Sequence, residues 1–233
     1  MMPTTGHSIS GAIGQGFGRM MNLGISAEII YSFVIIVCSL MIFFGTKEFY
    51  RLSNHKGIKY FRRAFLFFAL AYFFRSFIKI ILFYFEAAEL RTILPIFGSV
   101  TLFIFMYFGS MAIFYLLFSV MYKKWNNKLR VYIFHAVSLI MATLVIIYRN
   151  PTTYLLINSL LFIFVSSTVY NYSRLKKKSS NLFVIYFLLF IFWIFNILDV
   201  LIPNIFKTFQ LLIYLTSLGI FMTILYKVIR KTG

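Results

Sequence analysis

The sequence predicts an all-α integral membrane protein, a bundle of seven transmembrane helices. Composition, the spacing of apolar runs and the placement of basic residues predict it. Of the 233 residues, 61% are hydrophobic and 12% are charged, whereas about a quarter of a soluble domain is charged. Because so few polar side chains cannot cover a water-facing core, lipid must be the solvent for most of the exterior.

Seven apolar runs are long enough to cross a bilayer, since about 20 helical residues at 1.5 Å rise span about 30 Å of hydrocarbon. They cover residues 27–46, 62–86, 93–121, 130–148, 152–173, 181–202 and 206–228. We assign 26–233 to one transmembrane domain. The segment 1–25 carries five glycines between Gly11 and Gly24, which predicts a disordered segment or one lying at the membrane surface.

The basic residues fix the predicted orientation. The chain has 23 Lys and Arg against five acids, a net charge of +18. Seventeen of the 23 fall in the connections of one side or at the C-terminal end, and four fall on the other side. The positive-inside rule then places the N-terminus outside and the C-terminus in the cytoplasm of a cell membrane. We expect anionic headgroups, not nucleic acid, as partners of these loops.

Three charges lie deep inside apolar runs, where an isolated charge costs at least about 2.5 kcal/mol. Arg75 and Lys79 are one turn apart in the second run, and Asp199, with Asn196 one turn before it, is in the sixth. Counted at 1.5 Å per residue from the cytoplasmic edge, the two pairs reach similar depths, about 18–25 Å. We therefore predict that Asp199 pairs with Lys79 or Arg75 and leaves excess positive charge in the outer half of the bundle.

Further polar side chains could line the same region. Gln210, Tyr214 and Ser217 share one face of the last run, and Asn158, Ser159 and Thr101 lie in the fifth and third runs. One interpretation is a pocket for an anion or a lipid headgroup, with Arg75 or Lys79 as charge partner. The other is a structural salt bridge that orders the bundle. The candidate ligand-binding residues are Arg75, Lys79, Asn196, Asp199, Gln210 and Tyr214.

Enzymatic chemistry has few candidates in this chain. No HExxH, GxSxG or Walker motif is present, no pair of intramembrane aspartates exists, and Cys38 is the single cysteine. His135, about 9 Å inside the fourth run, is interpreted as a hydrogen-bond partner between helices or an interfacial group, with a proton relay as the alternative. We expect no catalytic residues, no metal and no cofactor.

The loop Lys47–Arg63 is the most polar of the predicted cytoplasmic connections, with a turn expected at His55-Lys56-Gly57. It could bind headgroups or dock a cytoplasmic protein partner. The stretch KEFYRLSNHKGIKYFRRAFLFFALAYFFR (Lys47 to Arg75), with the seven-span plan, resembles uncharacterised small archaeal membrane proteins. These in turn resemble the seven-helix N-terminal sensor regions of histidine kinases. Because the chain ends at Gly233 without an effector domain, the resemblance implies a stand-alone sensor-like or scaffold protein whose output needs a partner.

The leading hypothesis is therefore a non-enzymatic membrane protein of sensor or interaction type, with a cationic intramembrane pocket. The alternative is a small transporter with a 3+1+3 arrangement of helices. A lipid-modifying enzyme is the third hypothesis, and the shortage of acids and histidines argues against it.

Overall fold

A computed structural model describes the backbone of residues 7–87, 94–123, 128–148, 151–175, 187–194 and 207–232. Side chains are described for 27–78, 80–81, 96–123, 129–148, 153, 156–168, 187–194 and 211–228. Within these ranges all regular structure is helical, which confirms the predicted all-α class.

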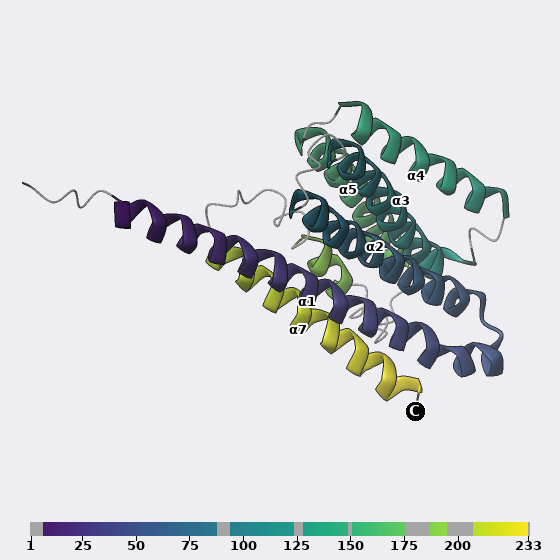
Figure 1. The fold of residues 1–233 in the computed structure, drawn as a ribbon. Coiled ribbons are helices and arrows are strands. Elements are labelled where there is room, and N and C mark those ends of the chain that lie inside the picture. The colour runs from purple at the N-terminus through teal and green to yellow at the C-terminus, as the bar shows by residue number, and fades with distance from the viewer. Residues whose placement is uncertain are drawn as a thin grey trace, which may run out of the picture.

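Each described helix contains or overlaps a predicted run, and the first helix extends 20 residues before its run and 7 after it. Their bounds are α1 His7–Ser53, α2 Lys56–Ala87, α3 Leu94–Met121, α4 Lys128–Tyr148, α5 Pro151–Leu175 and α7 Lys207–Thr232. A seventh helical stretch, 187–194, lies in the sixth predicted span. Residues 7–25, for which disorder or a surface position was predicted, form the first turns of α1, which extends beyond the other helices (Figure 1). Their position relative to a membrane stays a prediction.

Four helices among the described residues are long and apolar enough to cross a membrane. They are Ala27–Ser53 in α1, Ile96–Met121 in α3, Leu129–Tyr148 in α4 and Leu211–Val228 in α7. Their outward faces carry large apolar side chains. On α1, for example, exposed apolar residues recur every three or four positions, at Ile30, Phe33, Val37, Met41 and Phe44. Such a stripe facing outward is suited to lipid, and the chain is a multi-pass membrane protein.

The other three predicted spans, the second, fifth and sixth, are not among these four helices. In α2, the basic residues Arg62, Arg63, Arg75 and Lys79 interrupt the apolar run, and α2 packs between α1 and α3. The apolar part of α5 that is described is shorter, Leu156–Thr168. That these helices also cross the membrane stays a prediction.

Contacts between aromatic and polar side chains fix the direction of each helix. Tyr31 of α1 contacts Tyr72 of α2, and further along α1 Phe43 accepts a hydrogen bond from Arg62. The two helices are therefore antiparallel. α7 runs parallel to α1 and beside it (Figure 1), since Tyr31 stacks on Tyr214 and, about two turns later, Cys38 contacts Met222. The parallel α1 and α7 and the antiparallel α2 agree with the predicted topology, in which odd-numbered spans run in one direction and even-numbered spans in the other.

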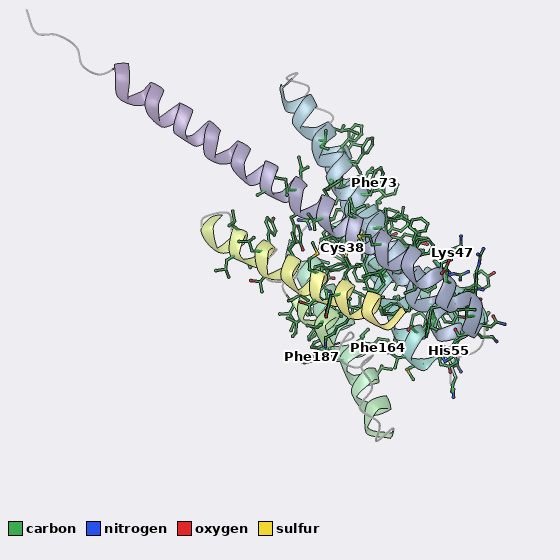
Figure 2. The ribbon with its side chains drawn as sticks, turned by 90° about the horizontal axis from the view of Figure 1, so that it is seen from below. Cys38, Lys47, His55, Phe73, Phe164 and Phe187 are labelled. Atoms are coloured by element: carbon green, nitrogen blue, oxygen red, sulfur yellow. The ribbon has the colours of Figure 1, made fainter. Side chains whose placement is uncertain are left out.

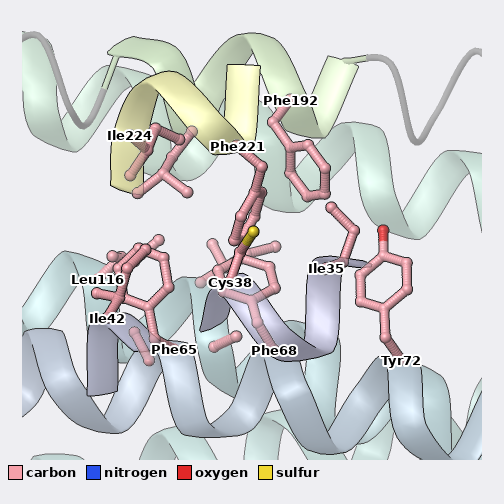
Figure 3. Close-up of a cluster of buried hydrophobic side chains, with 14 of the residues drawn as sticks. Ile35, Cys38, Ile42, Phe65, Phe68, Tyr72, Leu116, Phe192, Phe221 and Ile224 are labelled. Carbon is pink, nitrogen blue, oxygen red and sulfur yellow. The ribbon is translucent and has the colours of Figure 1, made fainter. Parts of the chain in front are cut away.

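The core lies where α1, α2, α3, the 187–194 stretch and α7 meet (Figure 3). Phe221 of α7 is at its centre, with ring centroids 4.9 Å from Phe192 and 6.0 Å from Phe65. Small buried residues, Ala64 and Ala112 among them, let the helices approach closely. Because lipid is as apolar as this core, van der Waals contact rather than exclusion from water holds it together.

The turn between α1 and α2 depends on two residues. Asn54 has φ 47°, the left-handed conformation that Asn tolerates, and its N–H donates to the carbonyl of Tyr50. Gly57, in the first turn of α2, is buried against α3, and a Cβ there would lie 3.0 Å from the backbone oxygen of Ser119. The predicted turn at His55-Lys56-Gly57 is thus found one to two residues earlier, and Gly57 serves helix contact instead.

We expect Gly57→Ala to destabilise the bundle by about 1–3 kcal/mol, because α2 and α3 must move apart to admit the methyl group. The midpoint of unfolding in an SDS titration of the detergent-solubilised protein, followed by circular dichroism, measures this. Gly45→Ala is the matched control. Nothing lies within 4 Å of a Cβ at Gly45, so alanine should leave stability unchanged or raise it by up to about 1 kcal/mol. Equal midpoints for Gly57→Ala and the wild type would contradict the close contact.

Candidate functional site

A buried ion pair joins α1 to α2. Both Nε and Nη2 of Arg75 donate to one oxygen of Glu28, at 3.0 and 2.5 Å. The side chains are only 15% and 12% exposed. In a bilayer neither charge would be tolerated alone at this burial, so each residue makes the other's position possible.

The ion pair continues into a group of tyrosines. Glu28 and Tyr31 are three residues apart on α1, and Tyr72 and Arg75 are three apart on α2, so the two contacts are successive steps of one antiparallel interface. The hydroxyls of Tyr31 and Tyr72 are 3.5 Å apart. The ring of Tyr31 stacks on Tyr214 of α7, with centroids 4.6 Å apart and planes 15° from parallel. We call Tyr31, Tyr72 and Tyr214 the tyrosine cluster.

A third helix, α3, supplies an aromatic contact to Arg75. The guanidinium of Arg75 lies 5.1 Å from the ring centroid of Phe105 of α3, a cation–π contact. Phe105 also packs edge-on against Tyr72 at 5.9 Å. Arg75 therefore has a carboxylate from α1 and an aromatic face from α3. The guanidinium thus holds the Glu28 carboxylate and lies over an aromatic ring.

Of the six candidate residues, the structure brings two into one region. Arg75 and Tyr214 are linked through Tyr31 and Tyr72. Lys79 and Gln210 lie on α2 and α7, but their side chains are outside the described ones. Asn196 and Asp199 lie outside the described residues altogether. The predicted pairing of Asp199 with Lys79 or Arg75 therefore stays a prediction, as does the pocket.

Sequence reasoning missed Glu28. We counted it among the five acids but did not consider it as a partner, because it begins the first apolar run while Arg75 is in the middle of the second. A signal was present: Glu28 is the single acid of the run 27–46. A pairing of the first two runs through their short connection would have placed it near the outer half of α2.

Buried hydroxyls provide a further polar element. Many serines and threonines of this bundle donate to the carbonyl four residues earlier, as Thr101 does to Phe97. Ser217 of α7 is 1% exposed, and its hydroxyl has no hydrogen-bond partner among the described residues. It lies one turn from Tyr214, on the face that was predicted to be polar. Asn158 is buried too, and its amide contacts the sulfur of Met106 at 3.5 Å.

A second polar group joins α3 to α4. The ring nitrogens of His135 lie 2.9 Å from the hydroxyl of Tyr107 and 3.1 Å from that of Tyr115. A neutral imidazole has one donor and one acceptor, so one tyrosine donates to it and the other accepts from it. His135 is thus the hydrogen-bond partner between helices that the sequence predicted. Arg63 lies over Tyr115, 5.9 Å from the ring centroid.

A comparison with known proteins finds a relative that covers most of this chain. A protein of Archaeoglobus fulgidus, named "Uncharacterized protein", is 31% identical over 212 residues, which are 89% of this chain and 93% of that protein. This chain belongs to the same family. The match covers nearly all of both chains, and it agrees with the resemblance to small archaeal membrane proteins. No protein-family model matches the chain, and no solved structure matches it.

We expect Arg75→Met to cost about 3 kcal/mol of stability, because it leaves the Glu28 carboxylate buried without its counter-charge. Adding Glu28→Gln should recover much of this loss, since the double variant has no buried charge at this position. A double-mutant cycle on SDS unfolding midpoints measures the coupling. Additive losses in the two single variants would show that the pair is not coupled.

Tyr107→Phe should destabilise the protein by about 1 kcal/mol, because it removes one hydrogen bond to His135 inside the membrane. In a His135→Phe background the same Tyr107→Phe substitution should cost almost nothing. The same unfolding assay compares the two backgrounds, with Tyr132→Phe, at an exposed position of α4, as control. An equal cost in both backgrounds would contradict the bridge.

Proposed function

We propose that this protein is a non-enzymatic, multi-pass protein of the cell membrane, of sensor or interaction type, that binds the anionic group of an amphipathic ligand at Arg75. The observation that carries the proposal is the Arg75–Glu28 ion pair. It supplies a desolvated guanidinium whose present partner belongs to a different helix. The distant likeness to sensor regions of histidine kinases belongs to the same proposal.

Binding would occur by exchange. A carboxylate or phosphate attached to an apolar body would replace the Glu28 carboxylate on Arg75 and place its apolar part against Phe105 and the tyrosine cluster. Arginine suits this role because its planar group holds such anions by two parallel hydrogen bonds. The buried hydroxyl of Ser217, which has no hydrogen-bond partner among the described residues, lies one turn from Tyr214 and supports a further polar contact for the ligand.

Exchange would also change the protein. Glu28 holds α1 against α2 at the predicted outer end, and its release would free α1 and the α7 helix stacked on Tyr31. A ligand can shift an equilibrium only by its difference in affinity for the two states. Here that difference arises because the ligand gains Arg75 only in the state where Glu28 has left it. A cytoplasmic partner would be needed to bind the state in which Glu28 has left Arg75 and so produce an output.

Native mass spectrometry of the purified full chain in mild detergent tests the proposal with two probes. Oleate carries a carboxylate on an acyl chain, and acetate carries the same group free in water. Arg75→Gln should weaken oleate binding at least about tenfold, the equivalent of one charge-assisted hydrogen bond. Glu28→Gln should strengthen it, because the competing carboxylate is gone. Acetate binding with the same pattern would identify a free anion as the ligand.

The opposite effects expected of Arg75→Gln and Glu28→Gln on oleate affinity distinguish ligand binding from a general loss of stability. A purely structural ion pair would make both variants bind oleate as the wild type does, or would weaken binding in both, and either result would contradict the proposal. Tyr132→Phe is the control, because Tyr132 is exposed on α4 and belongs neither to the Arg75–Glu28 pair nor to the tyrosine cluster. It should leave oleate affinity unchanged. Uptake of a substrate into proteoliposomes that depends on Arg75 would instead favour the transporter alternative.

A further inference from the structure

The end of the bundle that holds the α1–α2 turn carries a layer of exposed cations. Glu48 is the one exposed acid among its described side chains. Figure 2 shows Lys47 and His55 at this end, with most of the nitrogen atoms drawn there. The α3–α4 connection belongs to the same end, because the ring of Tyr122 packs on His55 with centroids 4.4 Å apart. The exposed basic residues are Lys47, Arg51, Lys56, Lys59, Lys123 and Arg130.

Two other arginines at this end are turned inward. Arg62 donates from Nε to the backbone oxygen of Phe43 at 3.0 Å, and its guanidinium lies 4.7 Å from the centroid of the Phe43 ring. Arg63 lies over Tyr115. The basic residues thus have two roles. Arg62 and Arg63 join helices, whereas the side chains of the exposed set face outward.

The exposed cations lie at the level of lipid headgroups. About 20 residues counted from Glu28 reach Lys47, where the hydrocarbon of about 30 Å ends. The end of α1 continues only about 7–8 Å further, to Leu52, which is the depth of one headgroup layer. Leu52 is 88% exposed and Phe49 38% exposed. Apolar side chains among cations are typical of surfaces that lie in a membrane interface.

We propose that the tip of the α1–α2 hairpin, with Lys47, Arg51, Lys56 and Lys59, binds the phosphate groups of anionic phospholipids in the inner leaflet. Cations from two separate connections lie at one end of the bundle, which fits the plane of a membrane better than a single acidic segment of a protein. A second copy of the chain is a poor occupant, since both copies carry the same positive charge. This surface is separate from Arg75 and does not depend on the function proposed above.

The test uses the full chain in nanodiscs that contain equal amounts of phosphatidylglycerol and phosphatidylcholine. Native mass spectrometry after release from the nanodisc gives the ratio of the two lipids that stay bound. The wild type should retain phosphatidylglycerol preferentially. Because each cation near an anionic surface contributes about fivefold, the variant with Lys47, Arg51, Lys56 and Lys59 all changed to Gln should lose at least about tenfold of that preference. High salt should reduce the wild-type preference as well.

A variant of opposite charge effect and two contradicting results define the outcome of the lipid-binding test. Glu48→Gln removes the exposed acid of the same surface and should increase the preference. An unchanged preference in the fourfold Gln variant, with a wild-type unfolding midpoint, would overturn the proposal. So would binding of soluble polyglutamate by the detergent-solubilised chain that is tighter than binding of phosphatidylglycerol, because the surface would then be one for an acidic protein.

Discussion

A charge in a bilayer needs a partner, and in this protein that requirement sets the position of two helices. Arg75 and Glu28 are bound to each other across the α1–α2 interface. The interaction fixes the register, since a shift by one turn along either helix would separate both charges from their partners. Tyr31 and Tyr72 then meet one turn further along, so the polar and aromatic contacts agree on a single alignment.

The other described helices join this hairpin through aromatic, apolar and hydrogen-bond contacts. α7 joins it through the stack of Tyr214 on Tyr31 and through Phe221, which touches Phe65 and Phe192. α4 is attached mainly to α3, by the hydrogen bonds of His135 and by apolar contacts such as those of Ala142 and Val145 with Met106. Since lipid offers the same apolar contacts as a protein core, such directional polar and aromatic contacts select one packing among many that are similarly apolar.

Some of this could be read from the sequence and some could not. The positions of the described helices followed from apolar length, because the thickness of a bilayer dictates it. The start of α1 did not follow, since α1 begins at His7, 20 residues before the first apolar run. That His135 bonds to a neighbouring helix followed from the cost of an unpaired polar group in lipid. Counting depth alone did not identify the partner of Arg75. It compared Arg75 with Asp199, because both lie deep in their runs, and passed over Glu28, which begins the first run. Aligning the first two runs as antiparallel neighbours across their short connection is the step that brings Glu28 near Arg75.

The same partner changes the chemistry expected of the site. Whether Lys79 and Asp199 leave an excess of positive charge there stays a prediction, but Glu28 supplies a carboxylate that neutralises Arg75 within the described part of the bundle. An anion therefore cannot bind to an empty cationic site; it must compete with a carboxylate already held at 2.5–3.0 Å. Under the proposed exchange, competition would cost affinity but would link the arrival of a ligand to a change in the contact between α1 and α2. A vacant cation would bind an anion more tightly without such a link, and this difference is why we propose a sensor rather than a permanent lipid anchor.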